Sequence, residues 1–175
     1  MLFKYPLLTY LIYFSHLCFS QISPAPGYLS QQHFPDSALN VELTTNSNDK
    51  LIFSELLNKY DEHKILLIFW ASWCPDSRAA LPNIKKLQKK MKNEDVAFVF
   101  LSTDKDFDTW KTAIKKLRID GEHYWFHKGQ ENELTNYIEL DWIPRFMALD
   151  KTGKVIFAKS VHANNPELKQ VLLNK

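Results

Sequence analysis

Cysteine and glycine are both scarce in this chain of 175 residues, which has two cysteines and four glycines. No stretch has a fixed period or low complexity, so repeat and disordered architectures are disfavoured. An excess of one charge is also missing, because 22 lysines and arginines nearly balance 20 aspartates and glutamates. Charge therefore gives no indication of nucleic acid or an anionic membrane as a partner.

The chain also lacks an apolar run long enough to span a membrane as a helix. Its most apolar N-terminal stretch, residues 7–19, follows the positive charge of Lys4 and is shorter than the roughly 18 to 20 residues a spanning helix needs. Small residues precede Gln21. This pattern is typical of a secretory signal peptide over residues 1–20, and an uncleaved N-terminal anchor is the less favoured alternative. We therefore expect an exported protein, periplasmic or extracellular.

Cleavage before Gln21 would change the cysteine count. Cys18 would leave with the signal peptide, and Cys74 would be the one thiol of the mature chain, unable to form an internal disulfide. A single thiol in an oxidising compartment is either a reactive group or a small buried hydrophobe.

The hydrophobic content of 45% suits one packed domain. Residues 21–40 are rich in proline, serine and glutamine, which predicts an N-terminal extension that lies over the domain or stays loose. The globular domain is predicted over residues 41–175.

The apolar pattern of that domain predicts an α/β fold. Strands are expected at residues 64–70, 96–101, 145–150 and 154–159, a short extended segment at 123–126, and helices at 79–91, 107–117, 131–140 and 166–173. The order is βαβα followed by ββα. Two strands joined through a helix imply a parallel pair. Gly153 falls in the turn of the final hairpin, where a positive φ is needed. Pro82 lies inside the first long helix, where we expect it to cause a kink.

Cys74 falls between a buried strand and a helix, within the segment Phe69-Trp70-Ala71-Ser72-Trp73-Cys74-Pro75-Asp76-Ser77. Unpaired backbone N–H groups and the positive end of the helix dipole favour a thiolate at such a position, which makes the sulfur a better nucleophile. A junction of this kind is also expected to be exposed. Position alone therefore favours a reactive Cys74 over an inert one.

These residues resemble the thioredoxin superfamily, and within it the exported TlpA-like thiol-disulfide oxidoreductases. The match covers the strand leading into Trp73-Cys74-Pro75, the helix proline Pro82, and Trp142-Ile143-Pro144-Arg145-Phe146 followed by an Asp-x-x-Gly turn. The resemblance implies the thioredoxin fold, a central mixed β-sheet flanked by helices. It also implies a cis-proline loop at Ile143 and Pro144 that faces Cys74.

The resemblance assigns roles to six residues. Cys74 and Ser77 are the candidate catalytic residues, and Trp73, Pro75, Ile143 and Pro144 are the candidate substrate-binding residues. The backbone of Ile143 would pair with an extended substrate strand.

The chain departs from the family pattern at Ser77, which occupies the place of the second cysteine. A dithiol enzyme releases its product when the second thiolate attacks the mixed disulfide, and a serine hydroxyl cannot do so. Ser77 can still donate to the thiolate through its N–H and hydroxyl. Acidic groups that assist proton transfer in relatives are replaced by Ile68 and Ala80.

Other kinds of site find no support. The histidines His123, His127 and His162 lack metal-ligand spacing to Cys74 or to carboxylates, and no nucleotide-binding or Ser-His-Asp motif appears, so neither a metal nor a cofactor is expected. A thiol peroxidase would need threonine or serine where Ala71 stands.

Two functions remain open. The first is thiol-disulfide exchange through Cys74 alone, in which a transient mixed disulfide is resolved by an external thiol. The partners would then be thiol- or disulfide-containing proteins or low-molecular-weight thiols, and no nucleic acid. The alternative is a binding module without turnover that holds extended or cysteine-containing proteins.

Overall fold

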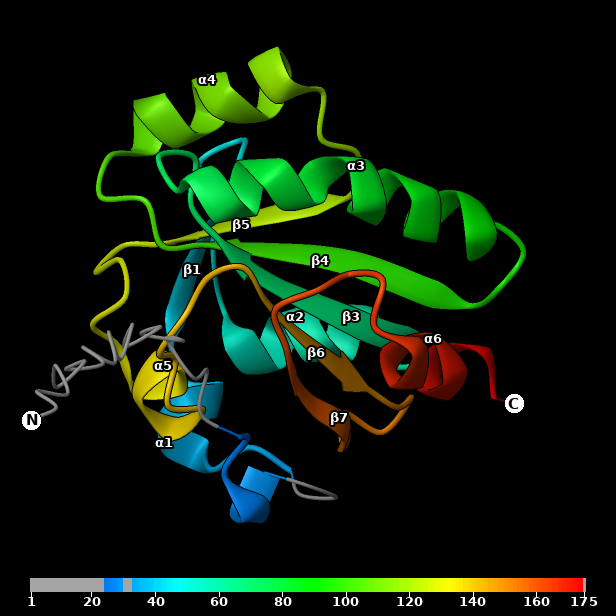
Figure 1. The fold of residues 1–175 in the computed structure, drawn as a ribbon. Coiled ribbons are helices and arrows are strands. Elements are labelled where there is room, and N and C mark those ends of the chain that lie inside the picture. The colour runs from blue at the N-terminus through cyan, green and yellow to red at the C-terminus, as the bar shows by residue number, and fades with distance from the viewer. Residues whose placement is uncertain (1–23, 30–32, 175) are drawn as a thin grey trace, which may run out of the picture.

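The computed structural model describes residues 24–29 and 33–174, and these form one α/β unit around a central sheet (Figure 1). The predicted signal peptide, residues 1–20, lies outside the described residues, and so does Cys18.

In the described part of the chain the sheet has seven strands in the spatial order β2-β1-β5-β4-β3-β6-β7. The central strands β3, β4 and β5 run parallel to one another, whereas β6 is antiparallel to β3 and β1 is antiparallel to β5. The sheet is therefore mixed, as predicted. Its strands are β1 Glu42–Thr45, β2 Lys50–Ile52, β3 Lys64–Trp70, β4 Val96–Ser102, β5 Glu122–Phe126, β6 Arg145–Leu149 and β7 Val155–Ser160.

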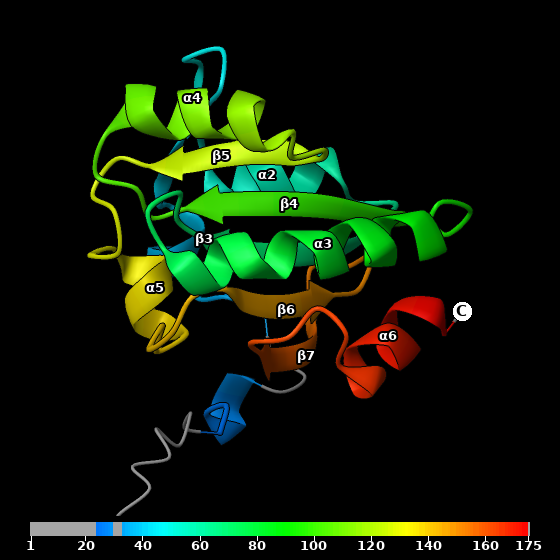
Figure 2. The ribbon, with the colours of Figure 1, turned by 45° about the horizontal axis from the view of Figure 1, so that its top comes forward.

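Helices cover both faces of this sheet (Figure 2). The helices α3, α4 and α6 contribute to the apolar cluster on one face, and α1, α2 and α5 contribute to the cluster on the other. Their bounds are α1 Asp36–Leu39, α2 Phe53–Lys59, α3 Pro75–Lys90, α4 Phe107–Leu117, α5 Glu133–Tyr137 and α6 Pro166–Leu173, with a short 3-10 helix at Gly27–Leu29.

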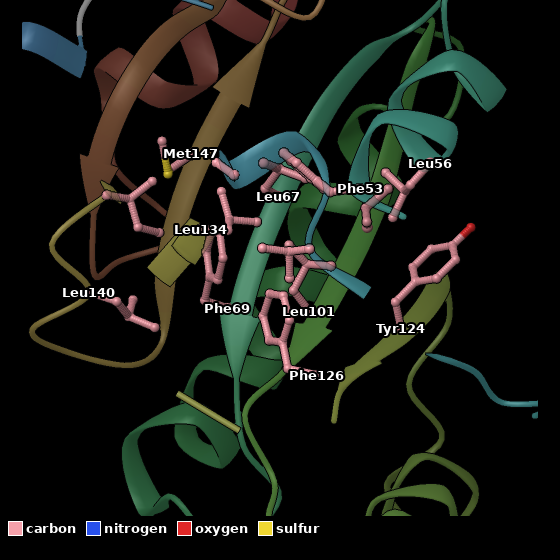
Figure 3. Packing of buried hydrophobic residues seen from close by; sticks show 14 of the residues in the cluster. Phe53, Leu56, Leu67, Phe69, Leu101, Tyr124, Phe126, Leu134, Leu140 and Met147 are labelled. Carbon is pink, nitrogen blue, oxygen red and sulfur yellow. The ribbon is translucent and has the colours of Figure 1, made fainter. Parts of the chain in front are cut away.

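Strand β3 forms the centre of both apolar clusters. Its side chains alternate between the faces, so that Leu67 and Phe69 point into the cluster of α1, α2 and α5, while Leu66 and Ile68 point into the other. Figure 3 shows the first cluster, where β3 packs with side chains of α2, α5 and the neighbouring strands. Burial on both faces explains the unbroken apolar run of this strand.

The register of the sheet brings distant segments to one end of β3. Phe69 in β3 pairs with Arg145 at the start of the antiparallel strand β6. The residues that follow Phe69 therefore lie opposite those that precede Arg145. The parallel strands β4 and β5 also end at this edge, which is where α/β sheets place their ligands.

Several predicted elements are confirmed. The strand at 64–70 and the helices at 107–117 and 166–173 have the predicted bounds, and Gly153 has a φ of 78°. Two helices need correction: the one predicted at 79–91 begins at Pro75, and the one predicted at 131–140 is shorter, Glu133–Tyr137. The sequence pattern did not predict β1, β2 or α2.

Part of the segment predicted as an extension contacts the core. Leu29, Phe34 and Ala38 are buried, and the Phe34 ring meets that of Phe53 at 5.1 Å in an edge-to-face arrangement. This aromatic pair stabilises the fold by more than its buried area alone would.

Candidate active site

Cys74 lies between the end of β3 and the first turn of α3, as the sequence indicated. It is the N-cap residue of α3, and its Sγ accepts a hydrogen bond from the Ser77 N–H at 3.5 Å. Pro75 occupies the first turn, where its missing N–H costs the helix nothing. Cys74 thus takes the capping role that a serine or aspartate oxygen usually has, with its sulfur aimed at the positive end of the helix.

Ser77 is almost completely buried, with 1% of its surface exposed. Its backbone N–H points to Cys74 Sγ, whereas its hydroxyl oxygen has no hydrogen-bond partner within the described residues. A buried hydroxyl without a partner is unfavourable by about 1 to 3 kcal/mol. The hydroxyl beside Cys74 is therefore free to donate to another group.

The second part of the site is the loop before β6. The Ile143–Pro144 peptide bond is cis, in line with the cis-proline loop that the resemblance implied. The Cys74 thiol donates to the Ile143 carbonyl oxygen, with 3.4 Å between Sγ and O. Both Ile143 and Pro144 are buried. The structure thus brings Cys74, Ser77, Ile143 and Pro144 together.

The tryptophans on either side of this centre are exposed. Trp73, which precedes Cys74, has 61% of its surface exposed, and Trp142, which precedes Ile143, has 40%. Pro75 is exposed as well. Cys74 itself is only 7% exposed, so the exposure expected at this junction was wrong for Cys74: its sulfur is covered while the side chains of Trp73 and Pro75 on either side are exposed.

A buried carboxylate, Asp104, holds the loop that carries Cys74. Asp104 follows β4 and is 1% exposed. One oxygen of its carboxylate accepts from the Ser72 hydroxyl at 2.6 Å, and the other accepts from the Ser72 N–H at 2.9 Å and the Ser102 hydroxyl at 2.6 Å. Hydrogen bonds to a charged acceptor are stronger than hydrogen bonds to a neutral one. Asp104 therefore fixes the backbone two residues before the nucleophile.

A buried cation, Arg145, holds the cis-proline loop. Arg145 directly follows Pro144 and is fully buried. Its guanidinium donates to the carbonyl oxygens of Ile138 at 3.3 Å and Glu139 at 3.1 Å, and it pairs with Asp141. Asp141 also pairs with Lys159 at 2.6 Å. These bonds tie the turn after α5 to the start of β6.

The electrostatics of this cation site are shaped by burial. Burial lowers the pKa of Arg145, and the nearby Asp141 carboxylate partly restores it. Burial alone would raise the pKa of Asp141, but hydrogen bonds from Lys159 and Arg145 outweigh it and hold the pKa below its ordinary value.

Sequence reasoning missed both Asp104 and Arg145. A signal for Asp104 existed, since it follows an apolar strand parallel to the one before Cys74, and the carboxyl ends of parallel strands meet at one edge. Arg145 gave no such signal, because an arginine at a strand start is ordinarily a surface charge.

The two positions where the resemblance implied acids are apolar here. Ile68 is fully buried in β3, and Ala80 is partly buried in α3. Asp76 is exposed in the first turn of α3. Within residues 24–29 and 33–174, no group of three or more His, Cys, Asp or Glu side chains could hold a metal ion, and no helix is long and apolar enough to cross a membrane.

A helix that begins at a cysteine, opposite a cis-proline loop on a mixed sheet, defines the thioredoxin fold. Residues 62–155 match the family described as thioredoxin-like, which is more than half of the chain. The chain belongs to this family.

Solved structures of thiol-disulfide oxidoreductases share the fold. One from Bacteroides fragilis is 28% identical with a TM-score of 0.64, and the match covers 82% of this chain and 99% of that one. A Bacteroides vulgatus protein assigned to the same activity is 26% identical with a TM-score of 0.66, covering 82% and 90%. The chain is thus thiol-disulfide oxidoreductase-like.

Among curated proteins, nucleoredoxin 1 of Arabidopsis thaliana is 30% identical over 112 residues. That match covers 61% of this chain but 18% of the relative. The similarity therefore concerns one part of a much longer protein.

Proposed function

We propose that this protein carries out thiol-disulfide exchange through Cys74 alone, with an external thiol completing each cycle. The observation that carries the proposal is the position of Cys74 Sγ, which is bonded to the Ser77 N–H and lies 3.4 Å from the Ile143 carbonyl beside Pro144. Cys74 is the one cysteine among the residues that the structure describes, and serine stands three residues after it.

The cycle has two steps. In the first, the Cys74 thiolate attacks one sulfur of a substrate disulfide; a new S–S bond forms, the old one breaks, and the leaving thiolate takes up a proton. In the second, an external thiolate attacks the mixed disulfide and releases Cys74 as a thiolate. After these two steps one substrate sulfur is a thiol and the other is joined in a disulfide to the external thiol. A second external thiolate then attacks that disulfide, which completes reduction of the substrate and oxidises the two external thiols to a disulfide.

Each neighbour of Cys74 has a place in this cycle. The Ser77 N–H and the free Ser77 hydroxyl stabilise negative charge on the sulfur, both as the attacking thiolate and as the leaving thiolate. The hydrogen bond from the Cys74 thiol to the Ile143 carbonyl is lost when the thiol is deprotonated. The carbonyl is then free to accept from the backbone of an incoming substrate. Trp73, Pro75 and Pro144 shape the contact surface around the sulfur.

The motif supports our proposal that the protein belongs to the exported TlpA-like branch of the superfamily. Its lysine-led apolar segment at residues 7–19, followed by small residues before Gln21, supports export. We place the active chain in the periplasm or outside the cell. There Cys74 meets disulfides that an oxidising compartment maintains.

The test is the reaction of the protein with a neutral disulfide such as bis(2-hydroxyethyl) disulfide. The full chain carrying Cys18→Ser leaves Cys74 as its single thiol, and Cys74→Ala in that background is the matched control. We expect a mixed disulfide by mass spectrometry only when Cys74 is present, and its removal by added thiol. Absence of any Cys74 adduct would exclude the exchange function.

A binding module without turnover is the second candidate, favoured by the exposure of Trp73 and Trp142 beside a nearly buried sulfur. Partners purified with the wild type and with Cys74→Ala separate the two functions. Equal capture by both proteins supports binding. Adducts that require Cys74 and disappear under reductant support exchange.

A further inference from the structure

A cavity of about 730 Å³ lies beside Trp73, outside the contacts already described. It is lined by residues from three loops, namely Trp73 after β3, Thr103 and Lys105 after β4, and residues 127–131 after β5. All three strands are parallel and end at this edge of the sheet. The volume falls within the range of about 300 to 1,000 Å³ that small-molecule sites occupy.

The loop after β5 lies against the loop after β4 at Gly129 and is held by a hydrogen bond from Asn132. Gly129 has a φ of 59°, and a Cβ there would meet the Thr103 carbonyl oxygen at 3.4 Å. The buried Asn132 side chain donates to the Gly129 carbonyl at 3.0 Å while it caps α5. The left-handed glycine thus allows the β5 loop to approach the β4 loop closely.

The cavity carries unpaired positive charge. Lys105 and Lys128 line it, and neither forms an ion pair with any residue that the structure describes. The titratable groups facing the same space are His127 and one acid, Glu131. The Asp104 carboxylate is buried, accepts from Ser72 and Ser102, and does not line this space. The lining therefore has a net positive charge close to the nucleophile.

We propose that this cavity binds the carboxylate-bearing part of a low-molecular-weight thiol or disulfide while its sulfur reacts at Cys74. The inference rests on the proposed exchange function and names the class of its external thiol. Lys105 and Lys128 supply two cationic donors for carboxylates, and Trp73, the residue before Cys74, lines the same cavity. A larger cavity, of about 780 Å³, surrounds Lys64 and α6 at the opposite end of β3, far from the thiol.

The experiment compares three aliphatic disulfides that differ in charge: glutathione disulfide, an anion at neutral pH, bis(2-hydroxyethyl) disulfide, which is neutral, and cystamine, a cation. The rate of Cys74 adduct formation is measured in the full chain carrying Cys18→Ser. Lys105→Gln with Lys128→Gln is the test pair, and Lys115→Gln with Lys116→Gln, exposed at the end of α4, is the control pair with the same charge change.

We expect the test pair to slow the reaction with glutathione disulfide by about fivefold to tenfold, and to leave the neutral rate within about twofold. The control pair should change neither rate by more than about twofold. Two results would overturn the cavity as a carboxylate site. One is an equal effect of the test pair and the control pair of lysine substitutions on the rate with glutathione disulfide. The other is an equal slowing of the reactions with all three disulfides by the test pair. An acidic peptide whose cysteine is in a disulfide, reacting faster than glutathione disulfide and depending on the same lysines, would also overturn it, in favour of a protein segment.

The neutral disulfide separates this inference from the function on which it rests. If it reacts with Cys74 while charge has no influence, the exchange function stands and the carboxylate site fails. If no disulfide reacts, both fail.

Discussion

Two loops meet at Cys74, and buried charges of opposite sign hold them. The loop before α3 is held by the Asp104 carboxylate, which accepts from a backbone N–H and two hydroxyls. The loop before β6 is held by the Arg145 guanidinium, which donates to two backbone carbonyls and to Asp141. Each tether satisfies the kind of backbone group that its loop leaves unpaired.

The difference between the tethers lies in their partners. Asp104 accepts hydrogen bonds from neutral groups: the Ser102 hydroxyl at the end of β4 and the Ser72 hydroxyl just after β3. Arg145 depends in part on Asp141, whose side chain is 37% exposed and also pairs with Lys159. The loop with the nucleophile is therefore fixed by an internal network, and the cis-proline loop by a network that extends to the surface.

The largest expected effect comes from breaking the cation tether. Arg145→Met leaves the Ile138 and Glu139 carbonyls without their guanidinium donor and leaves Asp141 with Lys159 as its one partner, and we expect the free energy of unfolding to fall by about 3 kcal/mol. Urea unfolding measures the change. The control Lys159→Met removes the other partner of Asp141, a nearly buried ammonium, but leaves the carbonyl bonds in place, so its loss should be smaller than that of Arg145→Met. Equal losses in the two variants would show that the carbonyl bonds do not matter.

The anion tether is tested by Asp104→Asn, which keeps the shape but removes the charge. We expect a loss of about 2 kcal/mol in the free energy of unfolding, because bonds from Ser72 and Ser102 to a charged acceptor are weakened. The rate of Cys74 adduct formation should fall as well, since the backbone before the nucleophile loosens. The exposed Asp108→Asn, in the first turn of α4, is the control and should alter neither quantity.

A retained adduct rate in Asp104→Asn, together with the expected loss of stability, would assign Asp104 to the fold alone. The two readouts thus separate a positioning role from a purely structural one.

The smallest expected effect is a pH dependence of the cation tether. The pKa of Asp141 is lowered in the folded protein, so its contribution to stability is present above its unfolded pKa of about 3.9 and is lost as the pH falls further, through the folded value. The urea midpoint of the wild type should exceed that of Asp141→Asn at pH 6, and the two midpoints should converge as the pH falls below about 4. A constant difference between the two proteins at both values would contradict the expectation.

The sequence was informative about the loops but silent about the tethers. Cys74 could be placed because a buried strand followed by a helix start leaves a local pattern, whereas the places of Ser77 and Pro144 came from the resemblance to the thioredoxin superfamily. The strands β1 and β2 could not, because four and three residues are too short to show a period. Arg145 could not either, since its burial depends on carbonyls of residues 138 and 139 that only the fold brings near.

The most direct test of the account is the fate of a preformed mixed disulfide between Cys74 and a 2-hydroxyethylthiol group, followed by mass spectrometry in the Cys18→Ser chain. Without added thiol, we expect the adduct to persist, and with added thiol to disappear at a rate proportional to the thiol concentration. Ser77→Cys in the same background should release the group without external thiol, faster by at least about tenfold. Release from the unmodified Ser77 protein at the rate of Ser77→Cys, in the absence of external thiol, would contradict the account.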